Sequence, residues 1–199
     1  DVLDADAVFG SNTSTLPITG LAEASQRPEN FIGIHFFSPV ERMGLVEIIS
    51  GEKTSEATLA KAVDYVLAIR KTPIAVNDSR GFYTSRCFGT YTREGMEMLA
   101  EGIKPAIIEN VGRQSGMPMG PLEVSDSVGL DTALKVTRAT AEAAGIDLQS
   151  DDRTQFLAWL VEDQERVGRK AGKGFYDYNE KGKPERLWPD LNSRLEVKV

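Results

Sequence analysis

Cysteine and histidine are the scarcest reactive residues of this sequence, which has one of each in 199 residues. The single cysteine, Cys87, excludes an internal disulfide and a cysteine-based metal cluster, and we expect no metal site. No apolar run approaches the roughly 20 residues that a membrane-spanning helix needs. The first ten residues, "DVLDADAVFG", have no basic segment followed by an apolar one, as a signal peptide would. These absences predict a cytoplasmic protein with no membrane span.

Positive charge is also scarce, because 23 Lys and Arg stand against 30 Asp and Glu, a net charge of −7. Such a balance argues against nucleic acid or an anionic membrane as the main partner, although a few lysines can still bind a phosphate. The hydrophobic content of 41% is that of a globular protein with a core. The length allows one sizeable domain or two small ones.

The first third of the chain alternates strand-like and helix-like segments. Helical patterns occupy "ITGLAEASQRPEN", which ends around Pro28, and "EATLAKAVDYVLAIRK". Four short runs rich in Val, Ile and Phe are typical of strands: "AVFGSN", "FIGIHFF", "LVEIIS" and "TPIAVND". The alternation predicts an α/β sheet that is covered by helices.

The pattern changes at "NDSRG", residues 77–81. Beyond Gly81 we expect helices bounded by glycine or proline, and then a turn-rich tail, "GKGFYDYNEKGKPERLWPDL". The sequence therefore predicts two domains, residues 1–78 with the sheet and residues 79–199 with an all-helical core.

His35 lies inside the apolar run "FIGIHFFSPV". A histidine in such surroundings is more often a packed core residue than a catalyst. This one, however, is close to the end of a strand, where ligands of open α/β sheets bind. Glu47 interrupts the next apolar strand, where an unpaired carboxylate is expensive to bury. A carboxylate that binds one imidazole nitrogen leaves the second nitrogen free to accept a proton. We therefore interpret His35 and Glu47 as a catalytic dyad, and the alternative is a structural ion pair.

Several longer motifs resemble those of the L-3-hydroxyacyl-CoA dehydrogenases of fatty-acid β-oxidation. They occur in the order and at about the spacing of that family: "SNTSTLPIT", "GIHFFSPVERMGLVEII", "NDSRGFYTSR", "GMPMGPLEVSDSVGLD" and "GRKAGKGFYDY". The sequence is most similar to the dehydrogenase part of the multifunctional fatty-oxidation α-subunits. The resemblance implies a Rossmann-type NAD-binding domain, of which residues 1–78 are the C-terminal half, followed by a helical domain for dimerisation and substrate binding.

The resemblance also implies roles for individual residues. His35 matches the base that takes the proton of the 3-hydroxyl while hydride passes to NAD, and Glu47 matches its carboxylate partner. Ser11 matches a serine that contacts the substrate oxygen and lies near the cofactor. Lys170 matches a lysine that reaches NAD. Taken alone, Ser11 is typical of a turn or helix cap, and Lys170 of a solvated surface charge.

Two positions depart from the usual family pattern. Ser85 in "GFYTSR" stands where single-function members have an asparagine, so a shorter hydroxyl replaces an amide that helps to hold the substrate. Ser38 in "HFFSP" stands where many members have asparagine, at a polar contact to the cofactor. Ser85 is therefore a candidate substrate-binding residue and Ser38 a candidate cofactor-binding residue.

A dinucleotide fold binds pyrophosphate through a glycine-rich turn after its first strand. This sequence has no such turn, because "GMPMGP" lies among the helices and "VFGSNTS" lacks the glycine spacing. We therefore expect a fragment of a longer enzyme that is inactive alone. The resemblance implies an acyl-CoA substrate, a homodimer formed through the helical domain, and hydratase and thiolase partners in the parent complex.

Two further hypotheses remain at this point. The isolated chain could be a non-catalytic module that binds acyl-CoA or oligomerises. Alternatively, Ser11, His35 and Glu47 could form a hydrolytic triad, although no nucleophile-elbow motif surrounds Ser11.

Overall fold

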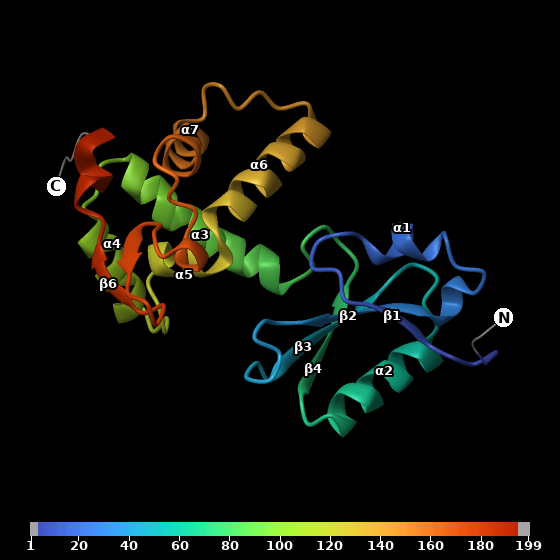
Figure 1. Ribbon diagram of the computed structural model, residues 1–199. Coiled ribbons are helices and arrows are strands. Elements are labelled where there is room, and N and C mark those ends of the chain that lie inside the picture. Colours follow the sequence, from blue (N-terminus) through green and yellow to red (C-terminus); the bar gives the residue numbers. More distant parts are fainter. Residues whose placement is uncertain (1–3, 195–199) are drawn as a thin grey trace. The chain divides into compact units, whose positions relative to one another are not determined.

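The computed structural model describes residues 4–194, in two compact units that divide between Gly89 and Thr90. The first unit is built on a four-stranded sheet, and the second is mainly helical (Figure 1). Each unit has its own buried apolar core. The predicted fold class, a Rossmann-type α/β part followed by a helical part, is confirmed.

The sheet contains the four predicted strands in chain order: β1 (Phe9–Ser11), β2 (Phe31–Phe36), β3 (Leu45–Ser50) and β4 (Thr72–Asn77). β1 pairs with β2 in parallel, and β3 pairs with β4 in parallel. β2 and β3 are antiparallel, because residues 37–44 return the chain directly to the neighbouring position. The sheet is therefore mixed and not purely parallel.

Helices cover both faces of the sheet (Figure 1). Helix α1 (Ile18–Ala22) packs on one face with Phe31 and Ile49, and helix α2 (Glu56–Ala68) packs on the other with Ile32 and Ile48. Side chains of a strand alternate between the two faces of the sheet, which explains how "FIGIHFF" contributes to the apolar core under α1 and to the one under α2. The same alternation puts the side chains of Phe31 and His35 on the α1 face, where Gly33 between them leaves room for Ile18 of α1.

α1 is shorter than the sequence predicted. The helical pattern runs as far as Pro28, but α1 ends at Ala22 and a short 3-10 turn, η1 (Pro28–Asn30), precedes β2. Between the two, the hydroxyl of Ser25 accepts a hydrogen bond from the backbone N–H of Arg27. Such local side-chain bonds compete with helix continuation.

Five helices form most of the second unit, and the first of them, α3, begins in the first unit: α3 (Thr84–Ala100), α4 (Pro105–Gln114), α5 (Pro121–Val128), α6 (Leu130–Ala144) and α7 (Asp152–Ala158). The proline that opens α4 and the one that opens α5 occupy a first helical position, where the missing N–H is harmless. α6 stops at Gly145, whose φ of 65° is the left-handed conformation that favours glycine. α7 continues into the π-helical turn η2 (Trp159–Asp163).

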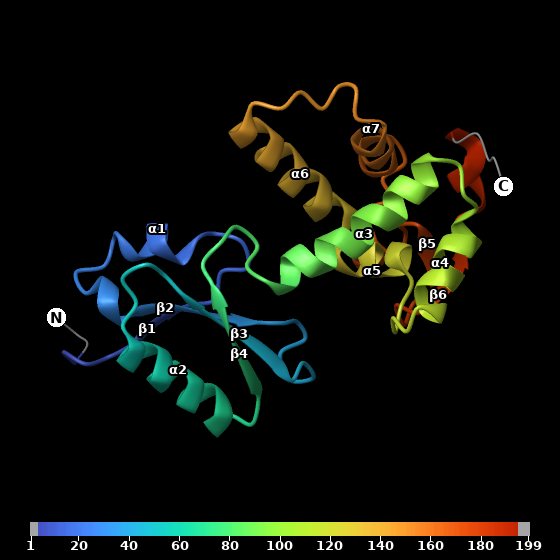
Figure 2. The ribbon, with the colours of Figure 1, turned by 180° about the vertical axis from the view of Figure 1, so that it is seen from behind.

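The turn-rich tail forms a β-hairpin, which the sequence analysis did not predict. Strands β5 (Tyr176–Tyr178) and β6 (Pro184–Leu187) pair in antiparallel fashion between two 3-10 turns, η3 (Arg169–Ala171) and η4 (Pro189–Arg194). The hairpin lies beside α4 and α5 (Figure 2). Phe175 and Leu191, at its two ends, are fully buried in the core of the second unit.

Within residues 4–194, no helix has both the length and the apolar character to span a membrane.

Candidate active site

His35 and Glu47 face each other across two neighbouring strands. They are register partners in the antiparallel pair of β2 and β3, so their side chains emerge on the same face. Nδ1 of His35 lies 2.7 Å from Oε2 of Glu47, and the exposed fractions of the two residues are 6% and 0%. The register thus brings together the two residues that the sequence analysis interpreted as a dyad.

The second carboxylate oxygen of Glu47 is bound by the start of α3. Oε1 accepts hydrogen bonds from the backbone N–H groups of Tyr83, at 3.1 Å, and Thr84, at 2.8 Å. With Oε1 occupied by these two donors, Oε2 is the oxygen that faces Nδ1 of His35. When the carboxyl group is ionised, Oε2 can only accept, so Nδ1–H is then the donor and Nε2 of the neutral ring is the free acceptor.

Two aromatic rings flank the imidazole. The ring of Phe37 lies 4.5 Å from that of His35, and the ring of Phe82 lies 6.0 Å from it, measured between centroids. Apolar walls lower the local polarity, which strengthens the hydrogen bond between His35 and Glu47.

Ser11 ends β1, one strand away from His35. Its register partner is Gly33, two residues before His35 on β2, so Ser11 points to the α1 face as His35 does. Beyond the strand, the side-chain oxygen of Asn12 accepts from the backbone N–H of Phe36, at 2.9 Å, which keeps this segment beside the end of β2. Among the described residues, Ser11 makes no hydrogen bond to His35.

Of the other two predicted serines, one follows His35 closely in the chain and the other lies beside a residue that binds Glu47. Ser38 is exposed and directly follows Phe37, in a cis peptide with Pro39. Ser85 is half-buried in the first turn of α3, next to the Thr84 amide that binds Glu47.

Lys170 belongs to the second unit, in η3, and the structure does not bring it together with His35 in one unit. Its Nζ lies 2.7 Å from Oδ2 of Asp131, and this contact lowers the pKa of the Asp131 carboxyl. The lysine side chain remains 56% exposed, so it has both a protein partner and access to solvent.

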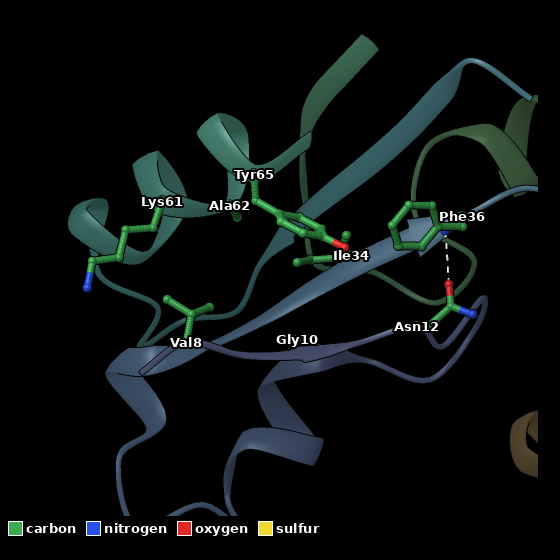
Figure 3. Close-up of a pocket in the computed structure, with 8 residues that line it drawn as sticks. All are labelled: Val8, Gly10, Asn12, Ile34, Phe36, Lys61, Ala62 and Tyr65. Carbon is green, nitrogen blue, oxygen red and sulfur yellow. Dashed lines mark hydrogen bonds between the residues drawn. The ribbon is translucent and has the colours of Figure 1, made fainter. Parts of the chain in front are cut away.

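A cavity of about 370 Å³ lies between the sheet and α2 (Figure 3). His35 and Glu47 point to the other face, on which α1 packs. Side chains of β1, β2 and α2 line the cavity: Val8, Gly10, Asn12, Ile34, Phe36, Lys61, Ala62 and Tyr65. Its walls are mostly apolar, and neither His35 nor Glu47 belongs to them. The cavity is therefore separate from the candidate active site.

Two buried carboxylates in the second unit escaped the sequence analysis. Asp126 of α5 accepts from the backbone N–H groups of Phe175 and Tyr176 and from the hydroxyl of Tyr178. Burial raises the pKa of Asp126 to about 6 against the lowering effect of these donors. Glu109 of α4 accepts from the hydroxyl of Tyr176, at 2.7 Å. The only sequence signal for these two buried carboxylates was the presence of an acidic residue within each of two amphipathic helices.

An α/β unit with a buried His–carboxylate pair near its strand ends, joined to a helical unit, fits the class of dinucleotide-dependent dehydrogenases. The family model of the "3-hydroxyacyl-CoA dehydrogenase, NAD binding domain" matches residues 1–79. That of the "3-hydroxyacyl-CoA dehydrogenase, C-terminal domain" matches residues 81–178. The chain belongs to the 3-hydroxyacyl-CoA dehydrogenase family.

Individual relatives agree with this family. The chain is 41% identical, over 191 residues, to the fatty acid oxidation complex subunit alpha of Shewanella halifaxensis, covering 96% of this chain and 26% of that protein. The crystal structure of (S)-3-hydroxybutyryl-CoA dehydrogenase PaaH1 from Ralstonia eutropha superimposes with a TM-score of 0.77 and 34% identity, covering 87% of this chain and 61% of that one. FadB2 of M. tuberculosis gives a TM-score of 0.77 and 31% identity, covering 89% and 62%. The chain thus spans less than two thirds of each.

NAD is the cofactor of the family's N-terminal domain. The residues at the carboxyl ends of β1 and β2 fit such a cofactor, because dinucleotides bind at strand ends and Ser11 offers a hydroxyl group there, on the face that carries His35. The sequence contains no glycine-rich turn for the pyrophosphate.

Proposed function

We propose that this chain carries the catalytic dyad of an NAD-dependent L-3-hydroxyacyl-CoA dehydrogenase of fatty-acid β-oxidation. The observation that carries the proposal is the buried hydrogen bond of 2.7 Å between His35 and Glu47. It gives the imidazole a fixed orientation and one free acceptor nitrogen, which a general base requires.

In this proposal His35 removes the proton of the 3-hydroxyl group through Nε2, and the C3–O bond becomes a ketone. NAD, when bound, supplies the acceptor for the hydride that leaves C3. The proton makes the imidazole a cation, and Glu47 stabilises that cation through Nδ1. Phe37 and Phe82 restrict water around the ring, which strengthens this charge pairing.

Three other residues of the first unit belong to the proposed site. Ser11 and Ser85 bind the substrate, the former at its oxygen and close to the cofactor, and Ser38 contacts NAD. Lys170, in the second unit, is proposed separately as a residue that binds NAD. The half-buried position of Ser85 next to Thr84 and the shared face of Ser11 and His35 support these assignments. We also propose that the chain consists of two functional domains, residues 1–78 and residues 79–199.

We also propose that the protein is cytoplasmic and forms a homodimer through its helical part. Ile107 and Val111, one turn apart on α4, and Met117 beyond it are exposed apolar residues that support an interface. The name of the Shewanella relative describes a subunit of a fatty acid oxidation complex. Hydratase and thiolase partners are proposed on the same basis.

A second candidate function is a non-catalytic module that binds acyl-CoA or oligomerises. The absence of a glycine-rich turn from the given sequence favours it for this chain alone, because such a turn lets the backbone approach the pyrophosphate at a helix N-terminus.

NADH formation from 3-hydroxybutyryl-CoA distinguishes the two candidates. We expect activity when the chain is joined to a segment that supplies a glycine-rich dinucleotide-binding turn, and loss of that activity with His35→Gln. Acyl-CoA binding without turnover in this joined protein supports the module. Full activity with His35→Gln contradicts the dehydrogenase proposal.

A further inference from the structure

The segment between β4 and α3 contains two consecutive residues in the left-handed region. The φ angle of Gly81 is 77° and that of Phe82 is 47°. Glycine adopts this conformation freely, but a bulky aromatic residue does so only when its surroundings hold it there. Strained backbone of this kind is concentrated at functional sites.

Burial holds Phe82 in place. Its side chain is 1% exposed and packs with Ile18 of α1 and Ile49 of β3, on the face of the sheet that carries the dyad. Its ring faces His35 at 6.0 Å with an interplanar angle of 59°. The apolar core therefore stabilises a backbone conformation that the residue itself disfavours.

The turn directs the first two amides after it toward Glu47. The N–H groups of Tyr83 and Thr84 converge on Oε1 of Glu47, while Oε2 faces His35. The carboxylate cannot rotate without breaking its bond to a helix start or its bond to the imidazole. The positive end of the α3 dipole adds to its anchoring.

A local cap could have satisfied α3 in the usual way. Asp78 and Ser79 lie shortly before the helix, and both residue types are good helix caps. Asp78 instead accepts from the N–H groups of Ile18 and Thr19, at the start of α1. The cap of α3 comes from Glu47, 36 residues from Tyr83 in the chain. The first amides of α3 are thus capped by the dyad, whereas Ser79 bonds only to Phe82 within the preceding turn.

We propose that the left-handed turn at Gly81 and Phe82 is a positioning device for the dyad, and that Phe82 is a positioning residue that acts on His35 through Glu47. The turn fixes the carboxylate, and the carboxylate fixes the imidazole as the Nδ1–H tautomer with Nε2 free. The catalytic meaning of this arrangement rests on the proposed function, whereas the tautomer itself can be measured without catalysis.

The test uses the fact that His35 is the only histidine in the chain. Nitrogen-15 NMR of the ring, at a pH where it is neutral, identifies the tautomer without site assignment. Gly81→Ala is the informative variant, because an added Cβ would meet only Ser85 and Arg86 side chains at 3.6 and 3.8 Å, ordinary contact distances. The substitution therefore disfavours the turn without a clash. Gly145→Ala is the matched control, with a φ of 65° and no atom within 4 Å of the new Cβ.

We expect the unmodified chain and Gly145→Ala to show the Nδ1–H tautomer with a slowly exchanging Nδ1 proton. Gly81→Ala should give a mixture of tautomers and Nδ1 proton exchange about 10-fold faster or more. A folded Gly81→Ala chain with the His35 spectrum of the unmodified protein overturns the proposal.

If Gly81→Ala does not fold, hydrogen exchange in Glu47→Gln supplies the same test. Loss of the anionic acceptor should speed hydrogen exchange of the Tyr83 and Thr84 amides about 10-fold. The Cys87 amide, which donates to the carbonyl of Tyr83, should exchange at an unchanged rate and is the internal reference. Unchanged exchange at Tyr83 and Thr84 contradicts the proposal. Full dehydrogenase activity of His35→Gln contradicts the proposed function instead, and leaves the tautomer result in place.

Discussion

His35 and Glu47 are register partners on β2 and β3, and the distance of 2.7 Å between Nδ1 and Oε2 closes a buried pair on one face of the sheet. The register of the sheet, and not a flexible loop, places the two side chains opposite each other. Sites held by regular strands keep their geometry more tightly than sites on loops.

Replacement of either member of the pair should remove most of the dehydrogenase activity. In the enzyme that contains the full NAD-binding domain, we expect His35→Gln to lower kcat by about 10²–10⁴-fold. Glu47→Gln should lower it by roughly 100-fold or more, because the new amide can donate to Nδ1 and impose the wrong tautomer. Glu41→Gln is the control, since Glu41 is exposed on the connection between β2 and β3. Steady-state kinetics measure all three, and a Glu47→Gln enzyme as fast as Glu41→Gln contradicts the role of the carboxylate.

Asp126→Asn should destabilise the second unit. The carboxylate accepts from two backbone N–H groups and from the hydroxyl of Tyr178, and an asparagine turns an NH₂ group toward some of these donors. We expect a loss of about 2–4 kcal/mol in the free energy of unfolding. Urea unfolding measures it, with the exposed Asp64→Asn as the control, for which the change should stay within about 0.5 kcal/mol.

The same carboxyl predicts a dependence on pH. Burial raises the pKa of Asp126 to about 6 in the folded chain, against 3.8 as the ordinary value. Between these values the folded state binds more protons than the unfolded state, so this group adds stability as the pH falls from 7 to 4. Relative to Asp126→Asn, the unmodified protein should gain on the order of 2 kcal/mol over that range. A stability difference that is flat in pH contradicts the raised pKa.

Two neighbouring glycines should respond differently to alanine. A Cβ on Gly174 would overlap the carboxylate of Asp126, whereas a Cβ on Gly172 would meet no atom within 4 Å. Gly172→Ala should cost about 1–2 kcal/mol, because the φ of 73° is left-handed. Gly174→Ala should cost about 3 kcal/mol or more, because it displaces the carboxylate from its donors. Thermal unfolding compares them, and equal losses mean that close approach to Asp126 is unimportant.

Lys170→Gln separates a structural role from a cofactor role. The ion pair of Lys170 with Asp131 is exposed, so the free energy of unfolding should change by less than about 1 kcal/mol. In the enzyme with the full NAD-binding domain, KM for NAD should rise while kcat is retained. Lys173→Gln removes a comparable exposed pair, with Glu165, and should leave KM unchanged. The cofactor role is withdrawn if the two variants have the same KM.

Much of the first unit could be predicted because its strands are short, apolar and rich in β-branched residues. The pairing of His35 with Glu47 was suggested by two polar residues that are costly to bury on successive apolar strands. Sequence spacing does not show that the two side chains lie directly opposite each other, and the register of β2 and β3 does. The division of the chain at residues 78 and 79 and the roles of the candidate site residues stay predictions.

The remaining features depend on long-range contacts that have no local pattern. In the sequence, Phe82 is an ordinary apolar residue. Its left-handed backbone conformation depends on packing against Ile18 and Ile49. The β5–β6 hairpin was obscured by its many turn residues, although the carboxylate of Asp126 binds the amides where it begins. In each case, tertiary contacts determined a backbone conformation that local sequence propensity does not specify.

The contacts of Asp126 also set an order of events during protein synthesis. The carboxylate lies on α5, but its backbone donors belong to Phe175 and Tyr176, which leave the ribosome 49 and 50 residues later. Glu109 differs, because the backbone N–H of Leu122, only 13 residues downstream, already donates to it. A nascent chain that stops before Phe175 therefore holds the Asp126 carboxylate without its backbone donors, and burial of that carboxylate is expected to follow synthesis of the hairpin.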